Sequence, residues 1–216
     1  CALPICTATA STFSFAVNVS SSGYIGFSLA SGSTWYDCYA SSGATVPRNT
    51  WFHFAAVRDG STMRVYVNGV QNNTLSIGAS SVNDSSNVVT IGRMGDWDDN
   101  NYNGYVSSFR IIKGTCLYPS GTTFTPPTGP LTAITNTSLL TCQSNRFIDN
   151  SSNAFAITVN GSPSVQRFSP FSQGYPYSTS VTGGSGYFDG SGDYLTAGTR
   201  SEEHTSELQS RVDISY

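Results

Sequence analysis

The stretch TWFHFAAVRDGSTMRVYVNGV, residues 50–70, decides the fold of this chain. Its side chains alternate with a period of two, which is the pattern of a β-strand because successive strand residues point to opposite faces. The pairs DG at 59–60 and NG at 68–69 interrupt the alternating runs, and such pairs suit tight hairpin turns. The stretch therefore predicts an antiparallel hairpin, which NVVTIGR (87–93) and YNGYVSSFRIIKG (102–114) extend into a meander.

The rest of the chain indicates further strands and turns, without a segment of helical period. A Thr-, Pro- and Gly-rich segment, residues 114–130, predicts an extended connector after the meander. No apolar run approaches the roughly 20 residues of a membrane-spanning helix. These features favour an all-β sandwich. The other strand-like runs lie at 13–19, 24–29, 34–39, 138–143 and 155–159.

Residues 7–199 carry little charge: nine aspartates and no glutamate stand against one lysine and seven arginines, a net charge of −1. Such a surface offers no electrostatic footprint for nucleic acid and no polybasic attraction to a membrane. The seven arginines are scattered, and we interpret them as strand-end residues that aid solubility. Cys38, Cys116 and Cys142 lack paired spacing, so we interpret them as reduced, structural thiols.

Four motifs within residues 51–111 resemble those of a known family: W-x-H-x-A-x-V-R-x-G, R-x-Y-V-N-G, T-I-G-R and N-G-Y-x-S-x-F-R-I. They are similar to motifs of laminin-G-like, concanavalin A-like domains, above all to the variants repeated along tail-fibre and other virion proteins of marine bacteriophages. The resemblance extends over nearly all of residues 7–199. It implies an antiparallel jelly-roll β-sandwich of the concanavalin A-like lectin/glucanase type.

In the related modules, segments similar to LLTC and FDGSGDYL open a domain, whereas the meander closes one. The resemblance therefore implies that residues 7–130 are the latter part of one module with its Pro-rich connector. Residues 131–199 would then be the opening strands of the next module. Residues 138–198 could also fold back and complete the first module as a permuted sandwich, because long connections add little closure entropy.

Both ends of the chain have a different character. RSEEHTSELQS at 200–210 resembles the translation of a common sequencing adapter, ISY at 214–216 resembles its continuation, and CALPI at 1–5 resembles the reverse adapter. We therefore leave residues 1–6 and 200–216 out of the predicted fold and expect the chain to be a fragment of a longer gene. The alternative is a natural helical tail, since SEEHTSELQSR contains helix-forming residues after a serine cap.

The loop GDWDDNNYNG at 95–104 is the densest polar and aromatic cluster in the chain. An aromatic ring can stack on a sugar while carboxylate and amide groups bind its hydroxyls, so this loop is the candidate glycan site. An oxygen-rich loop also suits Ca²⁺, and an ordinary turn needs the same residue types. The predicted glycan-binding residues are Asp96, Trp97, Asp98, Asn101 and Tyr102.

Two further acidic turns, at 149–153 and 189–193, match positions at which the related domains often hold calcium at their rim. Asp149 and Asp193 are the candidate calcium ligands, although neither turn has the longer ligand series of an EF-hand and turn formation alone explains both. No other cofactor is expected. His53 has no partner in the sequence for catalysis or for zinc, so we interpret it as a packed, hydrogen-bonded sheet residue.

Residues 7–199 lack glutamate and therefore lack the Glu-x-Asp-x-(x)-Glu strand motif of jelly-roll glycosidases. Glycoside hydrolysis needs a pair of carboxyl groups, so we expect no enzyme activity. The expected function is that of a non-catalytic virion module, assembled in the host cytoplasm and acting outside it. It would contact host-surface glycans or neighbouring virion subunits, without binding nucleic acid or entering a membrane. A purely structural spacer is the alternative, and a polysaccharide-degrading glycosidase is less favoured.

Overall fold

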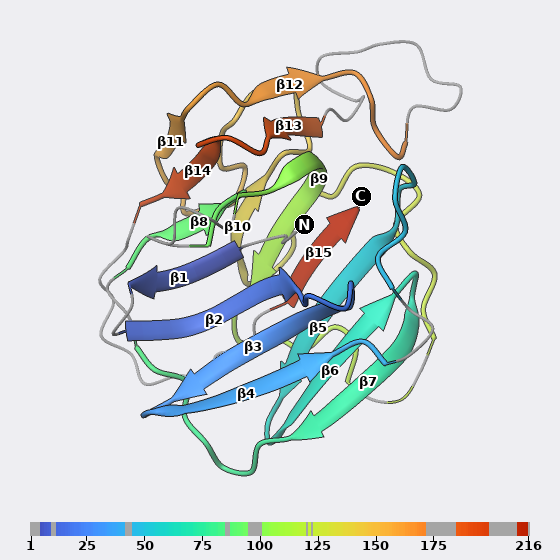
Figure 1. The fold of residues 1–216 in the computed structure, drawn as a ribbon, viewed down its shortest axis with the longest axis vertical. Helices are drawn as coiled ribbons and strands as arrows, with labels where there is room; N and C mark the ends of the chain where they lie inside the picture. The colour runs from blue at the N-terminus through green and yellow to red at the C-terminus, as the bar shows by residue number, and fades with distance from the viewer. Residues whose placement is uncertain are drawn as a thin grey trace.

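The computed structural model describes residues 5–9, 12–41, 45–84, 87–94, 101–119, 121, 123–171, 185–198 and 211–215. Within these residues every regular element is a β-strand, and the strands form two antiparallel sheets (Figure 1). The predicted all-β sandwich is thereby confirmed. No helix long and apolar enough to cross a membrane occurs in the described ranges.

The first sheet has seven strands, and the second has eight because β10 (Thr137–Thr141) pairs with β9 beside the main path. Across the first sheet the order is β11 (Ile157–Asn160), β14 (Tyr194–Ala197), β8 (Val89–Ile91), β1 (Ile5–Thr9), β2 (Thr12–Val19), β3 (Ile25–Ser31) and β4 (Thr34–Tyr39). Across the second it is β12 (Ser164–Gln166), β13 (Ser185–Asp189), β9 (Asn103–Ile112), β15 (Arg211–Ser215), β5 (His53–Asp59), β6 (Thr62–Val67) and β7 (Val70–Ser76).

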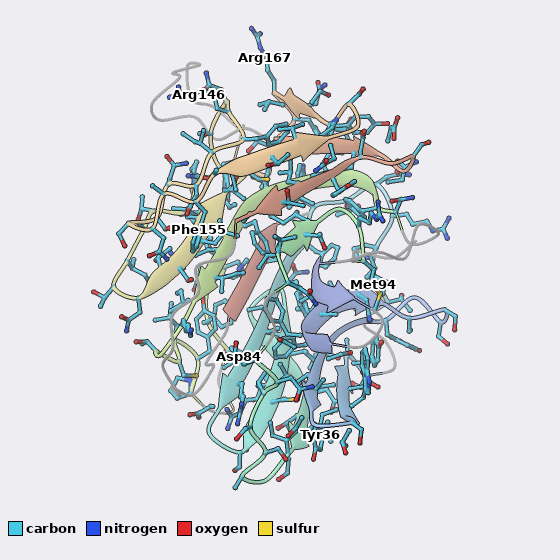
Figure 2. The ribbon with its side chains drawn as sticks, turned by 90° about the vertical axis from the view of Figure 1, so that its left-hand side faces the viewer. Tyr36, Asp84, Met94, Arg146, Phe155 and Arg167 are labelled. Carbon is cyan, nitrogen blue, oxygen red and sulfur yellow. The ribbon has the colours of Figure 1, made fainter. Side chains whose placement is uncertain are left out.

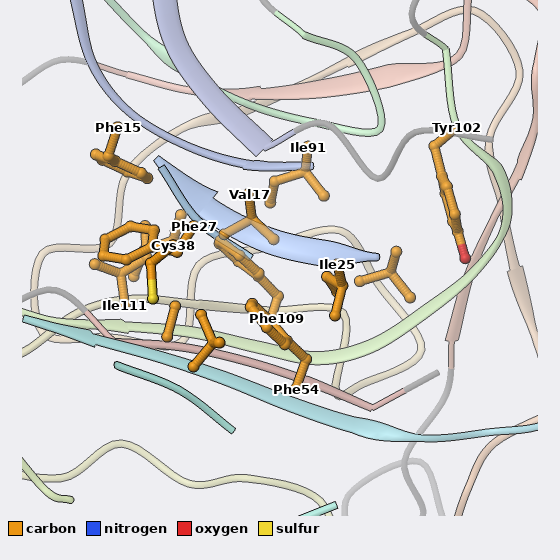
Figure 3. Packing of buried hydrophobic residues seen from close by; sticks show 14 of the residues in the cluster. Phe15, Val17, Ile25, Phe27, Cys38, Phe54, Ile91, Tyr102, Phe109 and Ile111 are labelled. Carbon is orange, nitrogen blue, oxygen red and sulfur yellow. The ribbon is translucent and has the colours of Figure 1, made fainter. Parts of the chain in front are cut away.

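The core lies between the two sheets and follows from the alternation along the strands. Ile25, Phe27 and Leu29 of β3 point inward from the first sheet, and Phe54 and Phe109 point inward from the second. Figure 3 shows the Phe27 ring between the sheets, close to Phe54 and Phe109. Full burial of one such side chain contributes about 1.5–3 kcal/mol. This shared apolar layer holds the two sheets together.

The hairpin turns of the meander form where the sequence predicts them. Asn68 and Gly69, with φ of 50° and 78°, join β6 to β7 as a two-residue turn. Gly60, with φ of 55°, lies in the turn between β5 and β6. A two-residue hairpin turn that matches the twist of the strands needs positive φ at both central residues, as at Asn68 and Gly69, or at the first of them, as at Gly60. The NG and DG pairs therefore predicted these connections correctly.

The described part of the connector, residues 114–119, 121 and 123–130, packs on the outer face of the second sheet. The rings of Tyr118 and Phe124 stack at 3.6 Å, and both contact the ring of Tyr66 on β6. The Tyr66 hydroxyl also donates a hydrogen bond to the carbonyl of Tyr118 at 3.2 Å. Tyr66 is fully buried as a result, although it points away from the main core. We call this region the covered face.

Strands from residues 137–197 enter both sheets. β10 and β13 pair with β9 in the second sheet, whereas β14 pairs with β8 and β11 pairs with β14 in the first. These strands and the meander thus share one sandwich, which is the arrangement that a permuted sandwich would have. The module boundaries at 7–130 and 131–199 stay a prediction.

The two ends of the chain also contribute strands, which the sequence analysis does not predict. β1 pairs with β2 and β8, and β15 lies between β5 and β9 and pairs with both (Figure 1). Strand pairing is made by backbone N–H and C=O groups, which every residue except proline offers. The pairing therefore carries no information on the resemblance of residues 1–6 and 200–216 to adapters, and that resemblance stays a prediction.

Candidate functional site

A groove of about 520 Å³ opens where the chain enters β5. Most of its lining consists of aromatic and proline rings, and its polar groups are hydroxyls, an amide and an imidazole. Ligand sites of proteins are concave, mainly apolar and of comparable size, with a few polar groups that orient the ligand. The lining residues are Trp51, Phe52, His53, Asn68, Thr125, Pro126, Pro127, Thr128, Pro170 and Phe171.

The β6–β7 turn positions one wall of the groove. The backbone N–H of Phe124 donates to the carbonyl of Gly69 at 2.8 Å, which ties the connector to the turn. A Cβ atom at Gly69 would overlap the carbonyl oxygen of Phe124, so only glycine allows this approach. The tie brings Thr125–Thr128 alongside His53. The NG pair therefore makes a turn and also docks the connector.

His53 lines the groove and is fixed on two sides. Its backbone N–H donates to Oδ1 of Asn68 at 2.9 Å, and its ring meets the ring of Phe124 edge-on at 5.5 Å between centroids. The side chain is buried. The interpretation of His53 as a packed sheet residue agrees with these contacts, and the hydrogen bond shown is made by its backbone. The described part of the chain contains no group of three His, Cys, Asp or Glu side chains that could hold a metal ion.

An aromatic row continues from the groove over the outer face of the second sheet. Phe168 contacts Trp51 at 5.2 Å and Tyr105 at 4.9 Å between ring centroids. Tyr105 of β9 and Tyr187 of β13 are direct partners across the strands, with centroids 5.0 Å apart. Phe168 is 54% exposed. The row joins segments far apart in the chain, so the sequence analysis missed it; the only local signal is that Tyr105 and Tyr187 alternate with buried neighbours.

The predicted glycan loop is described only at its C-terminal end. Asp96, Trp97 and Asp98 lie outside the described residues. Asn101 forms an isolated β-bridge with Arg93 and is half-buried.

Tyr102 is 1% exposed, and its hydroxyl donates to the carbonyl of Tyr105 at 3.2 Å. Its ring contacts Phe188 in the main core at 6.3 Å between centroids. A ring in this position offers no face to a sugar, so the predicted role of Tyr102 is corrected to that of a core residue. The role of the other loop residues stays a prediction.

Comparison with known proteins places the chain in a family. The model of a laminin-G-type domain, described as the Concanavalin A-like lectin/glucanases superfamily, matches residues 4–117. The chain belongs to the concanavalin A-like lectin/glucanase superfamily. No curated protein and no solved structure shows significant similarity to it. The match covers β1 to β9, including Trp51 and His53 of the groove.

The rim of this concanavalin A-like domain holds the first candidate calcium ligand, Asp149. Its Oδ1 accepts from the N–H groups of Leu140 and Ser151 at 3.0 and 2.8 Å. Its Oδ2 accepts from the Ser151 hydroxyl at 2.8 Å and from the N–H of Phe155 at 3.0 Å. Four donors thus surround a buried carboxylate, and they tie β10 to the turn that follows it.

Asp193 has a similar structural role in another turn. It is 1% exposed, its Oδ1 accepts from the N–H of Ser162, and its Oδ2 accepts from the N–H of Asp189 at 3.2 Å. A calcium ion needs six to eight oxygen ligands directed at one point, whereas N–H groups already approach both oxygens of each carboxylate. The described residues around Asp149 and Asp193 therefore do not fit a calcium site.

Two arginines of the concanavalin A-like domain correct the interpretation of this residue type as a solubility feature. Arg58 is buried and donates through Nε to the carbonyl of Gly60 and through a terminal nitrogen to the carbonyl of Ser80. Arg110 is buried and donates to the carbonyl of Thr132 at 2.9 Å. Guanidinium groups here hold loops against the second sheet, because a buried carbonyl needs a donor.

Proposed function

We propose that this concanavalin A-like domain is a non-catalytic carbohydrate-binding module whose ligand lies in the groove beside Trp51. The observation that supports the proposal is the combination of Trp51 with proline and hydroxyl groups in one concave site of ligand size. An indole can stack on the C–H face of a sugar ring, and the hydroxyls of Thr125 and Thr128 can exchange hydrogen bonds with sugar hydroxyls. Membership of a lectin/glucanase superfamily agrees with this class of ligand.

The charge of the groove favours a neutral glycan and argues against hydrolysis. No carboxyl group is present among its lining residues. Glycosidases need two carboxyl groups on either side of the scissile bond. A site built from rings, hydroxyls and one imidazole can hold a sugar but lacks the acid and the nucleophile that would cleave it.

The setting of this activity is the virion of a bacteriophage, where the module would act outside the host cell after assembly in its cytoplasm. This part of the proposal rests on the resemblance of the meander motifs to virion tail-fibre modules. Binding to one module would be weak, and repetition along a fibre would strengthen it. The second candidate function is a structural module that contacts neighbouring virion subunits, which the exposed ring of Phe168 would also serve.

The test is calorimetric titration of the full chain with a panel of soluble neutral polysaccharides, beside the variants Trp51→Ala and Trp51→Phe. We expect saturable binding that falls at least tenfold in Trp51→Ala and is largely kept in Trp51→Phe, because phenylalanine retains a ring for stacking. An assay for new reducing ends should stay at background. A folded chain that binds no member of the panel would overturn the proposal in favour of the structural module.

A further inference from the structure

The edge strand β4 presents two aromatic side chains and a carboxylate on the outer face of the first sheet. Tyr36 and Cys38 contact the core between the sheets. Because strand residues alternate in direction, Trp35, Asp37 and Tyr39 point to the other side. Trp35 is 46% exposed, and Asp37 is exposed as well. We call these three residues the β4 platform.

The strand next to the platform carries only small side chains on the same face. The register places Trp35 opposite Ala30 and Asp37 opposite Ser28. Met94 packs over Ala30 further from the edge. The platform side chains therefore stand beside the small outward side chains of β3. An extended ligand can lie along β4 because β3 offers little obstruction.

Tyr39 is held in place by two contacts. Its ring lies against Gly26, where a Cβ atom would overlap the ring carbons. Its hydroxyl donates to Oδ1 of Asn18 on β2 at 2.7 Å. The ring thus rests on the sheet and spans from β4 over β3 towards β2. A ring fixed in advance loses little conformational entropy when a ligand stacks on it.

Asp37 gives the platform its polarity. Its Oδ1 accepts a hydrogen bond from the buried hydroxyl of Ser28 at 2.5 Å, which orients the carboxylate. Among the described residues Asp37 forms no ion pair. Burial raises the pKa of Tyr39, and the negative charge of Asp37 raises it further. The platform is therefore negatively charged, which repels anionic ligands and suits ligands rich in neutral hydroxyl donors.

We propose that the β4 platform is a second contact site for a glycan, specifically for an extended neutral polysaccharide. Trp35 and Tyr39 are four residues apart on a strand, about 13 Å at the usual rise per residue, with the carboxylate of Asp37 between them. That length accommodates more than one sugar ring, with stacking at both ends and a hydroxyl acceptor in the middle.

The platform lies on the first sheet, whereas the groove lies where the chain enters β5 of the second sheet. In Figure 2 Tyr36 of β4 is at the lower end and Arg167, which precedes Phe168 of the aromatic row, is at the upper end. A long polysaccharide can bind at both sites or bridge two molecules. The inference shares its class of ligand with the proposed function but rests on different residues.

The test compares Trp35→Ala, Asp37→Asn and Trp51→Ala in the full chain, titrated with a soluble linear β-glucan, a galactomannan and the anionic polysaccharide alginate. Val70→Ala, which removes an exposed apolar side chain of β7, is the matched control. We expect Trp35→Ala to weaken binding of a neutral chain about tenfold and Asp37→Asn to weaken it a few-fold. Alginate should not bind the wild-type chain, and Val70→Ala should change nothing.

Melting temperatures of the variants show whether a loss of binding is a loss of fold. Unchanged affinity in Trp35→Ala, with reduced affinity in Trp51→Ala, would overturn the platform and leave the groove in place. Reduced affinity in Trp35→Ala alone would support the platform and overturn the groove. Absence of binding by the folded wild-type chain would overturn both.

Discussion

The outer faces of the two sheets differ in how far their aromatic side chains are covered. On the second sheet, the outward ring of Tyr66 is fully buried because Tyr118 and Phe124 of the connector pack on it. On the first sheet, the outward ring of Trp35 is 46% exposed. Both residues lie on strands with the same alternation. The difference lies in the path of the connector.

An outward aromatic residue on a strand thus becomes core or contact surface according to what crosses it. The connector is tied down by the hydrogen bond from Phe124 to Gly69, at the turn of the neighbouring hairpin. Near β4 a comparable tie is made by Asn83, which exchanges hydrogen bonds with Gly32 and donates to the carbonyl of Ala30, yet Trp35 stays 46% exposed. Burial makes Tyr66 a source of stability, whereas exposure leaves Trp35 available to a ligand.

The largest expected effect is on the covered face. Tyr66→Ala should lower the free energy of unfolding by about 3–5 kcal/mol, because it removes a buried ring and leaves a cavity. Trp35→Ala should change it by about 0.5 kcal/mol or less, because the ring is largely at the surface. Urea unfolding of both variants measures the contrast. Equal losses would show that the two faces do not differ as described.

The next largest effect is expected at Asp149. It tests whether this carboxylate stabilises the fold or binds calcium. Asp149→Asn should cost about 2 kcal/mol, because an amide nitrogen would face donors that now bind the carboxylate. Calcium chloride should leave the melting temperature of the wild-type chain unchanged, since binding to the folded state alone would raise it. A calcium-dependent rise that Asp149→Asn abolishes would restore the predicted metal site.

A smaller effect should follow from crowding the β4 platform. Gly26→Ala should cost about 1–2 kcal/mol, because the new methyl group displaces the Tyr39 ring. Gly129→Ala is the control, since a Cβ atom there meets nothing within 4 Å. Thermal unfolding compares the two variants. Should Gly26→Ala be as stable as the control, the Tyr39 ring would not rest on the sheet.

The smallest effect concerns the thiols between the sheets. Burial raises the pKa of Cys38 to about 11 and that of Cys142 to about 12, from a model-compound value of 9.0. The unfolded chain therefore releases these protons first, so the stability they contribute is present below pH 9 and is lost as the pH rises towards 11 and 12.

The free energy of unfolding, measured as a function of pH from about 8.5 to about 10.5, tests this effect. The range begins near the ordinary pKa of a thiol. Cys142→Ala should show a shallower decline than the wild-type chain, since it removes one of the two raised thiol pKa values. An identical slope in the two proteins would mean that Cys142 is accessible to water in the folded state.

The parts of the candidate site that local sequence could predict are the turns and the strand faces. The NG pair predicted the β6–β7 turn, and His53 was correctly interpreted as a packed sheet residue. Tyr102 could not be assigned in the same way, because its burial depends on Phe188, which is distant in sequence. The groove could not be predicted either, because its lining brings together Trp51, Pro126 and Phe171, which are far apart in the sequence.

The sequence by itself determined that this protein is an antiparallel all-β sandwich, because alternation and turn residues act between near neighbours along the chain. It also determined the absence of glutamate from residues 7–199. Only the tertiary structure decided which outward rings are buried, which arginines hold loops and where a groove opens. Those outcomes depend on contacts between segments far apart in the chain, and the path of a connector over a sheet is set by packing that no local pattern records.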